Sequence, residues 1–375
     1  MYAVYGLILL GVLGILFGFM YRWSLAVFIL SFSYSELVDA TNYLNHYYLV
    51  VLIGILLFFV PANRAVSLDC KMGRCRRLAR VPRWNITILQ LQLGLVYFFA
   101  GFAKLNPDWM LHGMPLATWM PEHAHWPLLG ELFNLEMTPL LFSWAGAFYD
   151  LSIPVWLSFA QTRRAAYFAV IVFHSLTGFL FNIGLFPMIM TGCTLVFFSP
   201  HRHEQFWKKT GLFSVKEESM PTVPSTTLIA FLALFFSVQI LLPLRHYVLP
   251  GDVLWNEAGY RFSWRVMLVE KHGHARFTVH DGCSDRWAEV QNDRYLSDFQ
   301  EKNMVIQPDF ILQYADFLKR TYREEYGFCE PVVKTDSYVS LNGRPAQRFA
   351  REDIDLTTIS PWEPYASWIK PLRHE

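Results

Sequence analysis

Long apolar runs dominate the first two thirds of the chain, and short polar stretches separate them. A helix needs roughly 20 mostly apolar residues to span a bilayer, and fewer where it forms a tight hairpin. The pattern therefore predicts about eight membrane-spanning helices. The runs lie at about 2–20, 24–38, 47–62, 86–103, 137–159, 165–181, 183–199 and 226–244.

After about residue 247 the pattern changes to polar sequence with alternating apolar positions. The segment FSWRVMLVEKHGHARFTVHD predicts two strands joined by a loop around residues 272–274. VVKTDSYVSLNGRPAQRFA predicts a hairpin that turns at Asn342-Gly343. Between them, QPDFILQYADFLKRTYREEYG has apolar residues at helical spacing and predicts a helix.

The two patterns predict the fold class and the domains. Residues 1–246 are expected to form an integral membrane α-helical bundle, and residues 247–375 a small extracytoplasmic α+β domain. Charged residues make up 17% of the chain, against about 25% in a typical soluble protein, which excludes a fully soluble protein. The net charge of +1 provides no bulk attraction to nucleic acid, so no nucleic-acid partner is expected.

Basic residues mark one face of the predicted bundle. They gather in the loops after the first, third, fifth and seventh helices, and the even-numbered loops are poor in them. The positive-inside rule makes these loops cytosolic and places the N-terminus and the tail outside the cytosol. The residues are Arg22, Arg64, Lys71, Arg74, Arg76, Arg77, Arg80, Arg83, Arg163, Arg164, Arg202, Lys208, Lys209 and Lys216.

The five cysteines are too few for a disulfide scaffold. Cys70 and Cys75 lie in a loop predicted to be cytosolic, so we expect plain thiols and no metal site. Cys283 and Cys329 lie in the outer tail, where a disulfide is permitted, and either a bond or two free thiols is compatible with the sequence.

Polar residues at the outer ends of membrane helices are functional candidates, because burying them in a bilayer is costly. Three segments of the chain bring such residues to the outer side. The first holds Glu36, Asp39, Asn42, Asn45 and His46, the second Lys104, Asp108 and Trp109, and the third His174 and Asn182.

Structural roles for these residues remain open. Lys104 could extend its amine to the interface, His46 and His174 could bond to backbone, and Asp39 could cap a helix or pair with Lys104. Chemistry favours an active role for Lys104. A lysine amine held out of water at an apolar boundary loses its proton more readily, and a neutral amine can act as a general base.

Five segments, in order, resemble the vitamin K-dependent gamma-carboxylase family. YFFAGFAKLNPDWM, preceded by VPRWNITILQLQLGLV, resembles the central signature of its membrane part, the HTTM domain. LVDATNYLNHYYL resembles an Asp-Lys-Thr-x-x-x-Asn-His segment, and VFHSLTGFLFNIGLFPMIM a Phe-His segment followed by Phe-x-Ile-Gly-x-Phe. In the tail, WNEAGYRFSWRVML and ASWIKPL resemble the family's Ser-Trp strand and its Trp-x-x-Pro-Leu segment.

This resemblance implies a reaction and its cofactors. Enzymes of the family oxidise vitamin K hydroquinone with O₂ to the epoxide, which generates a strong base. That base removes a γ-proton from a peptide glutamate, and the carbanion takes up CO₂. The implied cofactors are vitamin K hydroquinone, or another reduced menaquinone-type quinone, with O₂ and CO₂. The implied partners are membrane lipid and a glutamate-containing peptide or protein.

The resemblance also assigns roles to residues. By position, Lys104 matches the lysine that deprotonates the hydroquinone, and His46 matches the histidine beside it. Tyr43 stands where animal enzymes usually have Trp. The residues expected to bind the quinone or the substrate are Asp39, Tyr43, Asn45, Trp109, His174, Asn182, Phe186 and Trp264.

Departures from the family pattern leave alternatives. The chain begins where the family's second helix would begin, so we expect a first helix to be encoded upstream or supplied by another subunit. The sequence stops shortly after ASWIKPL, so we expect it to lack the β-rich region that holds the substrate propeptide in animal enzymes. We expect a multi-pass protein of a bacterial inner membrane, or of the endoplasmic reticulum in a eukaryote. The rival functions are a quinol oxidoreductase without carboxylation and a non-enzymatic lipid-binding or transport protein.

Overall fold

The computed structural model describes residues 1–78, 80–127, 130–181, 183–199, 203–205 and 223–373. The chain forms two compact units. Met1–Gly101 and Phe148–Ile240 make the first, and Phe102–Ala147 and Leu241–Glu375 the second. Residues 102–147 thus belong to the same unit as the tail, although they lie within the predicted membrane domain 1–246. The predicted division into domains at residue 246 stays a prediction.

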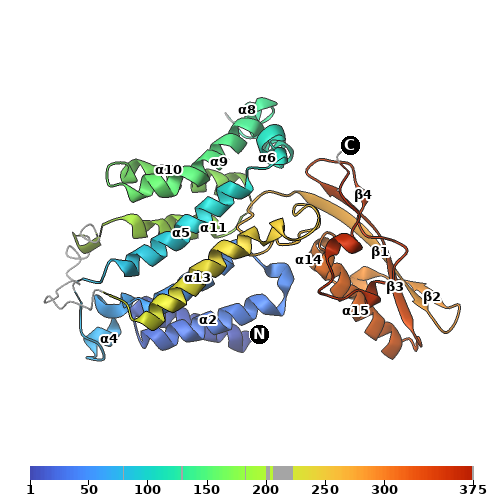
Figure 1. Cartoon of the computed structure of the whole chain (residues 1–375), viewed down its shortest axis with the longest axis horizontal. Helices are drawn as coiled ribbons and strands as arrows, with labels where there is room; N and C mark the ends of the chain where they lie inside the picture. The colour runs from blue at the N-terminus through green and yellow to red at the C-terminus, as the bar shows by residue number, and fades with distance from the viewer. Residues whose placement is uncertain (79, 128–129, 182, 200–202, 206–222, 374–375) are drawn as a thin grey trace. The chain divides into compact units, whose positions relative to one another are not determined.

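The first unit is helical (Figure 1). Each of the eight predicted apolar runs contains one of its helices. In chain order these are α1 (Tyr2–Phe17), α2 (Tyr21–Val38), α3 (Asn45–Phe59), most of α5 (Trp84–Ala103), the C-terminal half of α9 (Met137–Ser158), α10 (Arg163–Leu180), α11 (Phe186–Thr194) and most of α13 (Thr226–Leu244). The short helix α4 (Leu68–Lys71) lies between α3 and α5, outside the apolar runs.

Close packing holds these helices together. In the contact between α1 and α2, a Cβ added at Gly11 would lie 2.9 Å from the Cβ of Phe28. Small residues of this kind let membrane helices approach closely. Leu56 of α3 and Ile88 of α5 are buried in one apolar cluster, and Phe235 of α13 packs against it.

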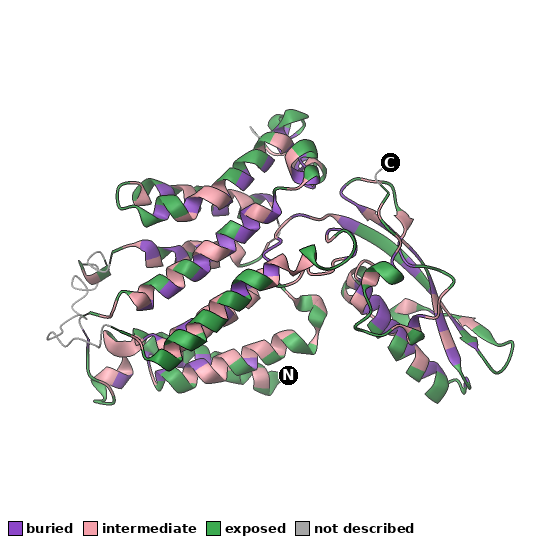
Figure 2. Ribbon diagram, in the orientation of Figure 1, coloured by how far each residue is buried: buried purple, intermediate pink, exposed green. Residues whose placement is uncertain are grey.

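Among the described residues, three helices are long and apolar enough to span a membrane: Trp84–Ala103, Met137–Ser158 and Thr226–Tyr247. The predicted number of about eight is therefore too high. The apolar runs include helix ends: α1, for example, ends at Phe17 because Gly18 adopts a left-handed φ of 60°. Many positions along α13 are exposed (Figure 2), including apolar Leu234 at 67%, as lipid contact requires.

The structure corrects one cysteine prediction. Cys70 and Cys75, expected as plain thiols, are joined in a disulfide. The short helix α4 and the turn after it bring their Cα atoms to 4.8 Å, within the range that a disulfide can bridge. In the same loop, Asp69 is buried and accepts hydrogen bonds from the backbone N–H groups of Met20 and Tyr21 at 2.9 and 3.1 Å.

The second unit combines short helices with an antiparallel sheet (Figure 1). The order of strands in the sheet is β2-β1-β3-β4. Its complete elements are α6 (Pro107–His112), α7 (Leu116–Trp119), α8 (Gly130–Phe133), β1 (Lys271–Asp281), β2 (Trp287–Glu289), α14 (Asp298–Met304), α15 (Pro308–Glu324), β3 (Pro331–Leu341) and β4 (Gln347–Arg348).

The predicted pair of strands around residues 272–274 is wrong. β1 runs through these residues without a break, and Gly273 pairs with Val339 of β3. The segment before β1 is irregular, because Phe262, Trp264 and Met267 adopt φ values of 58–60°. Residues with positive φ do not fit a strand, so the segment forms no strand although its apolar residues alternate.

Two other predictions for the tail are confirmed. The helix is α15, and its buried face includes Ile311 and Leu318. The hairpin is formed by β3 and β4 and contains Asn342 and Gly343 at φ values of 50° and 76°. Cys283 and Cys329 are joined in a disulfide, with Cα atoms 5.9 Å apart.

Candidate active site

Lys104 lies directly after the last residue of α5, in the tight connection to α6. Asn106 begins α6, and its side chain accepts a hydrogen bond from the N–H of Trp109 at 3.1 Å. The Trp109 ring lies beside the lysine, whose Nζ is 5.2 Å from the ring centroid. Lys104 is only 6% exposed, whereas a lysine that extends to the interface would expose its amine.

The indole of Trp109 is fixed from its other side. Its Nε1 donates a hydrogen bond to the carbonyl of Ser143 in α9 at 2.7 Å. Trp109 is 3% exposed, so the ring has little freedom to move. The aromatic face beside Lys104 is therefore rigid, and it lies within the range at which a ring attracts a cation.

Asp108 lies beside Trp109 and binds two side chains from the end of β3. Arg344 contacts both carboxylate oxygens, at 2.8 and 2.5 Å, and Asn342 donates to Asp108 at 2.8 Å. Burial alone would raise the pKa of Asp108, but the hydrogen bonds from Arg344 and Asn342 outweigh it and hold the pKa below its usual value. The carboxylate is therefore charged and occupied in a structural pair.

A cavity of about 390 Å³ adjoins these residues. Ala103 and Leu105, on either side of Lys104, line it together with Asp108 and Arg344. The buried Arg265 adds a second guanidinium to its wall, and burial lowers the pKa of that group. The cavity is thus apolar at the end of α5, while the two arginines of its polar wall are balanced in number by the carboxylates of Asp108 and Asp252. This lining suits a ligand with an apolar part and a polar part.

The first unit contains the second group of predicted site residues. Phe186, at the start of α11, lies between two histidines: its ring centroid is 5.9 Å from that of His46 and 5.8 Å from that of His174. Both histidines are buried. The Nε2 of His174 lies 3.1 Å from the hydroxyl of Tyr97. The structure therefore brings His46, His174 and Phe186 together, and adds Tyr97.

The turn before α3 and the first residue of α3 contain three further predicted residues. Asp39 caps a single helical turn and accepts hydrogen bonds from the N–H and the hydroxyl of Thr41. Tyr43 donates a hydrogen bond from its hydroxyl to the side-chain oxygen of Asn45 at 3.1 Å. Asn182 lies outside the described residues. His46 belongs to the first unit and Lys104 to the second.

Trp264, the remaining predicted residue, is buried in the second unit at 1% exposure. No sequence pattern pointed to Arg344, because the residue is 236 positions from its partner Asp108. Arg265, next to Trp264, was also missed, since an arginine in an apparent strand does not stand out. Tyr97 was hidden in an apolar helix, where only its hydroxyl distinguished it.

The family models agree with this architecture. Residues 1–201 match the HTTM domain, and residues 224–375 match the lumenal domain of vitamin K-dependent gamma-carboxylase. No solved structure matches the chain. The fold, the apolar helices and these matches define a membrane protein with a lumenal C-terminal domain. The chain belongs to the vitamin K-dependent gamma-carboxylase family.

Proposed function

We propose that this chain is a membrane γ-glutamyl carboxylase that couples oxidation of a reduced quinone to carboxylation of a peptide glutamate. The observation that carries the proposal is Lys104, a buried lysine at the end of an apolar helix, in a chain that matches both domains of the family. Both family domains favour an enzyme over a lipid carrier.

In this proposal Lys104 acts as the general base. It takes a hydroxyl proton from the reduced quinone, and its amine becomes an ammonium. The fixed face of Trp109 at 5.2 Å stabilises that ammonium, because the ring favours a cation. Burial of Lys104 excludes water that would otherwise compete for the proton.

The described residues fit a reduced quinone. The Nδ1 of His174 is buried and has no hydrogen-bond partner among the described residues, so it is available to a hydroxyl or carbonyl oxygen. The rings of His46 and Phe186 beside it suit a flat aromatic ligand. Vitamin K hydroquinone, with O₂, supplies a base strong enough for the glutamate γ C–H, which no side chain could deprotonate. Within the first unit, His46, Asp39, Tyr43 and Asn45 are proposed, on the family resemblance, to take part in quinone binding.

The test uses the purified full chain in detergent with a reduced quinone, O₂, labelled bicarbonate and a glutamyl peptide. We expect label in the peptide and epoxide in the quinone. Lys104→Ala should reduce both products by at least about 100-fold, the usual effect of removing a general base. A small added amine should restore part of the activity. Lys302→Ala, at an exposed position of α14, is the matched control and should keep full activity.

The outcomes separate the rival functions. Epoxide without fixed label in any of several peptides would identify a quinol oxidoreductase. Quinone binding without either product would indicate a lipid-binding protein. Full activity in Lys104→Ala would remove the lysine from the mechanism.

A further inference from the structure

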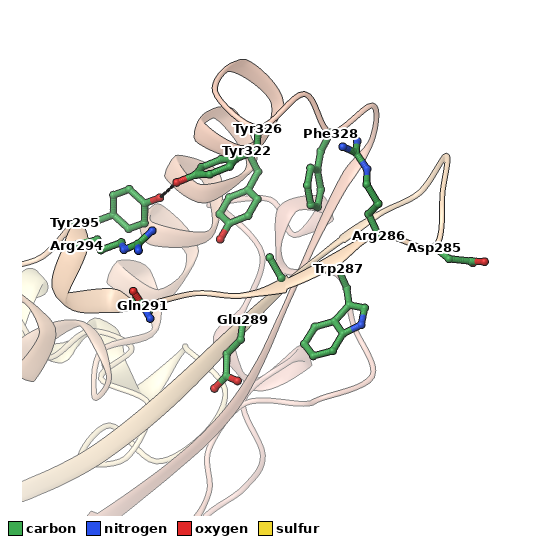
Figure 3. Close-up of a pocket in the computed structure, with 11 residues that line it drawn as sticks. Asp285, Arg286, Trp287, Glu289, Gln291, Arg294, Tyr295, Tyr322, Tyr326 and Phe328 are labelled. Atoms are coloured by element: carbon green, nitrogen blue, oxygen red, sulfur yellow. Dashed lines mark hydrogen bonds between the residues drawn. The ribbon is translucent and has the colours of Figure 1, made fainter.

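A second cavity lies in the lumenal part of the second unit, at the edge of the sheet. Its volume is about 590 Å³. The edge strand β2 forms one wall, and the C-terminal end of α15 with the following loop forms another (Figure 3). The site proposed for the reaction uses none of the residues that line this cavity.

Aromatic rings form the wall opposite β2. Tyr322 stacks on Tyr326 with ring centroids 4.8 Å apart, and Phe328 packs edge-on against Tyr322 at 5.3 Å. The hydroxyls of Tyr295 and Tyr326 lie 3.2 Å apart (Figure 3). Arg286 covers Phe328 at 4.8 Å. The rings therefore hold one another in place and offer a preformed apolar surface with hydroxyl groups at its rim.

The register of β2 shows which backbone groups face outward. The N–H of Asp281 donates to the carbonyl of Arg286, and the N–H of Val290 donates to the carbonyl of Phe277. Bonded and non-bonded pairs alternate along an antiparallel ladder. Trp287 and Glu289 are therefore in non-bonded pairs, and their N–H and C=O groups point away from β1. Since β2 ends the strand order, these groups can accept one more strand.

Side chains on the two faces of β2 add selectivity. Trp287 and Glu289 point away from the tyrosine rings, as Figure 3 shows, so they would contact the opposite face of an added strand. Trp287 is 62% exposed. Among the charged lining residues, Asp285 and Glu289 balance Arg286 and Arg294 in number. Arg286 is already paired with Asp281 at 3.0 Å. This balance disfavours a highly charged ligand such as a polyphosphate.

The geometry points to a docking site in which an extended segment of the polypeptide substrate adds to β2 as a strand and places an apolar or aromatic side chain among the tyrosines. The identity of this occupant rests on the proposed carboxylase function. Strand addition supplies affinity through the main chain, and the ring pocket supplies specificity. Docking away from the reacting glutamate raises the local concentration of each glutamate in the same chain.

The binding test needs no turnover. The probe is a fluorescein-labelled peptide of about ten residues, the length of a long strand. It alternates Val and Thr around a central Tyr, carries Lys at both ends and contains no Glu. Its anisotropy is measured with the full chain in detergent. We expect saturable binding, and at least tenfold weaker binding of a peptide with N-methylated alternate backbone nitrogens. Equal binding of the two peptides, or no binding of either, would overturn the proposal.

Two variants of one residue separate backbone pairing from side-chain contact. Trp287→Pro removes an outward N–H, and proline is tolerated on edge strands at such positions. Trp287→Val keeps the N–H. We expect at least tenfold weaker binding for Trp287→Pro, and less than threefold for Trp287→Val. A similar loss in both variants would contradict strand addition, and Tyr326→Ala should weaken binding if the ring pocket takes part. If Trp287→Pro does not fold, the N-methylated peptide on the wild-type chain decides.

Kinetics then distinguish this site from the proposed reaction. Trp287→Pro should raise KM at least tenfold for a long glutamyl polypeptide while leaving kcat and the KM of a short glutamyl peptide unchanged. Probe binding without any fixed CO₂ would contradict the carboxylase and leave the docking site standing. Concentration-dependent dimerisation of the full chain that Trp287→Pro abolishes would identify a second copy as the occupant and overturn the substrate assignment.

Discussion

The environment of Asp108 shows how one residue joins the segment after α5 to the lumenal sheet within the second unit. Asp108 is one position from Trp109 and four from Lys104, and its carboxylate is held by Arg344 and Asn342. Asn342 also accepts from the N–H of Glu270 at 2.8 Å. The turn after β3 therefore positions α6, and through α6 the ring beside the lysine.

Arg344→Ala should leave a buried carboxylate without its cation and destabilise the second unit by about 3 kcal/mol. The folded pKa of Asp108 is depressed, so the stabilisation is present above the unfolded value of about 3.9 and is lost as the pH falls through the folded value. The stability difference between wild type and Arg344→Ala should thus shrink below about pH 4. Thermal unfolding of both at pH 3 and pH 7 checks this.

The control is Arg348→Ala, which removes an arginine that pairs with the half-exposed Asp336 and Glu352 and donates to the hydroxyl of Tyr338 at 2.7 Å. Its cost should be below about 1 kcal/mol at either pH. An equal loss of stability in the two variants would show that the pair between Arg344 and Asp108 contributes no more to stability than an exposed ion pair.

At the scale of elements, the sequence predicted those helices and turns that a local pattern of residues determines. The helix α15 followed from its apolar spacing, and the hairpin turn from Asn342-Gly343, whose positive φ values those residue types favour. The strand expected around Trp264 failed because its left-handed backbone is set by tertiary packing. Lys104 could be proposed as a site residue because its segment is a short local motif, whereas Arg344 and Arg265 reach the cavity beside it through contacts that no local pattern encodes.

The turn itself can be tested with one glycine. Gly343 has a φ of 76°, so Gly343→Ala should destabilise the second unit by about 1 kcal/mol, the cost of placing an L side chain in the left-handed region. Gly192→Ala in α11 is the matched control. An added Cβ there meets nothing within 4 Å and the φ is ordinary, so we expect no loss of stability. Denaturant unfolding measures both, and a neutral Gly343→Ala would contradict the assigned backbone strain.

At the scale of the molecule, the family matches agree with the sequence on a helical membrane part followed by a lumenal part. The number of spanning helices did not follow from the sequence, because apolar runs do not show where a helix ends. The runs at 2–20 and 47–62 contain helices of 16 and 15 residues. The basic loops still predict that the tail lies outside the cytosol, where the Cys283–Cys329 disulfide can persist.

That disulfide should account for much of the stability of the lumenal part. It joins cysteines separated by 46 positions, and closing a loop of this length stabilises a fold by about 4 kcal/mol in the chain-entropy description. Asp281 accepts hydrogen bonds from the N–H groups of both cysteines, at 3.4 and 3.0 Å. The disulfide and the Asp281 carboxylate therefore connect the same two segments of the chain. Replacing both cysteines by Ala should lower the unfolding midpoint, measured by the intrinsic fluorescence of the tail.

Asp281→Asn should lower the midpoint as well, because hydrogen bonds from Ser284 and Arg286, against the effect of burial, hold the pKa of this carboxyl below its usual value. Its stabilising effect is present above about pH 4 and decreases as the pH falls through the folded pKa. Cys193→Ala removes the free cysteine of the described residues and should leave the midpoint unchanged. If the double cysteine variant unfolds at the same temperature as wild type, the disulfide does not stabilise the contact between the two segments at Asp281. The β1–β3 pairing that ends at Asp281 must then stabilise this contact.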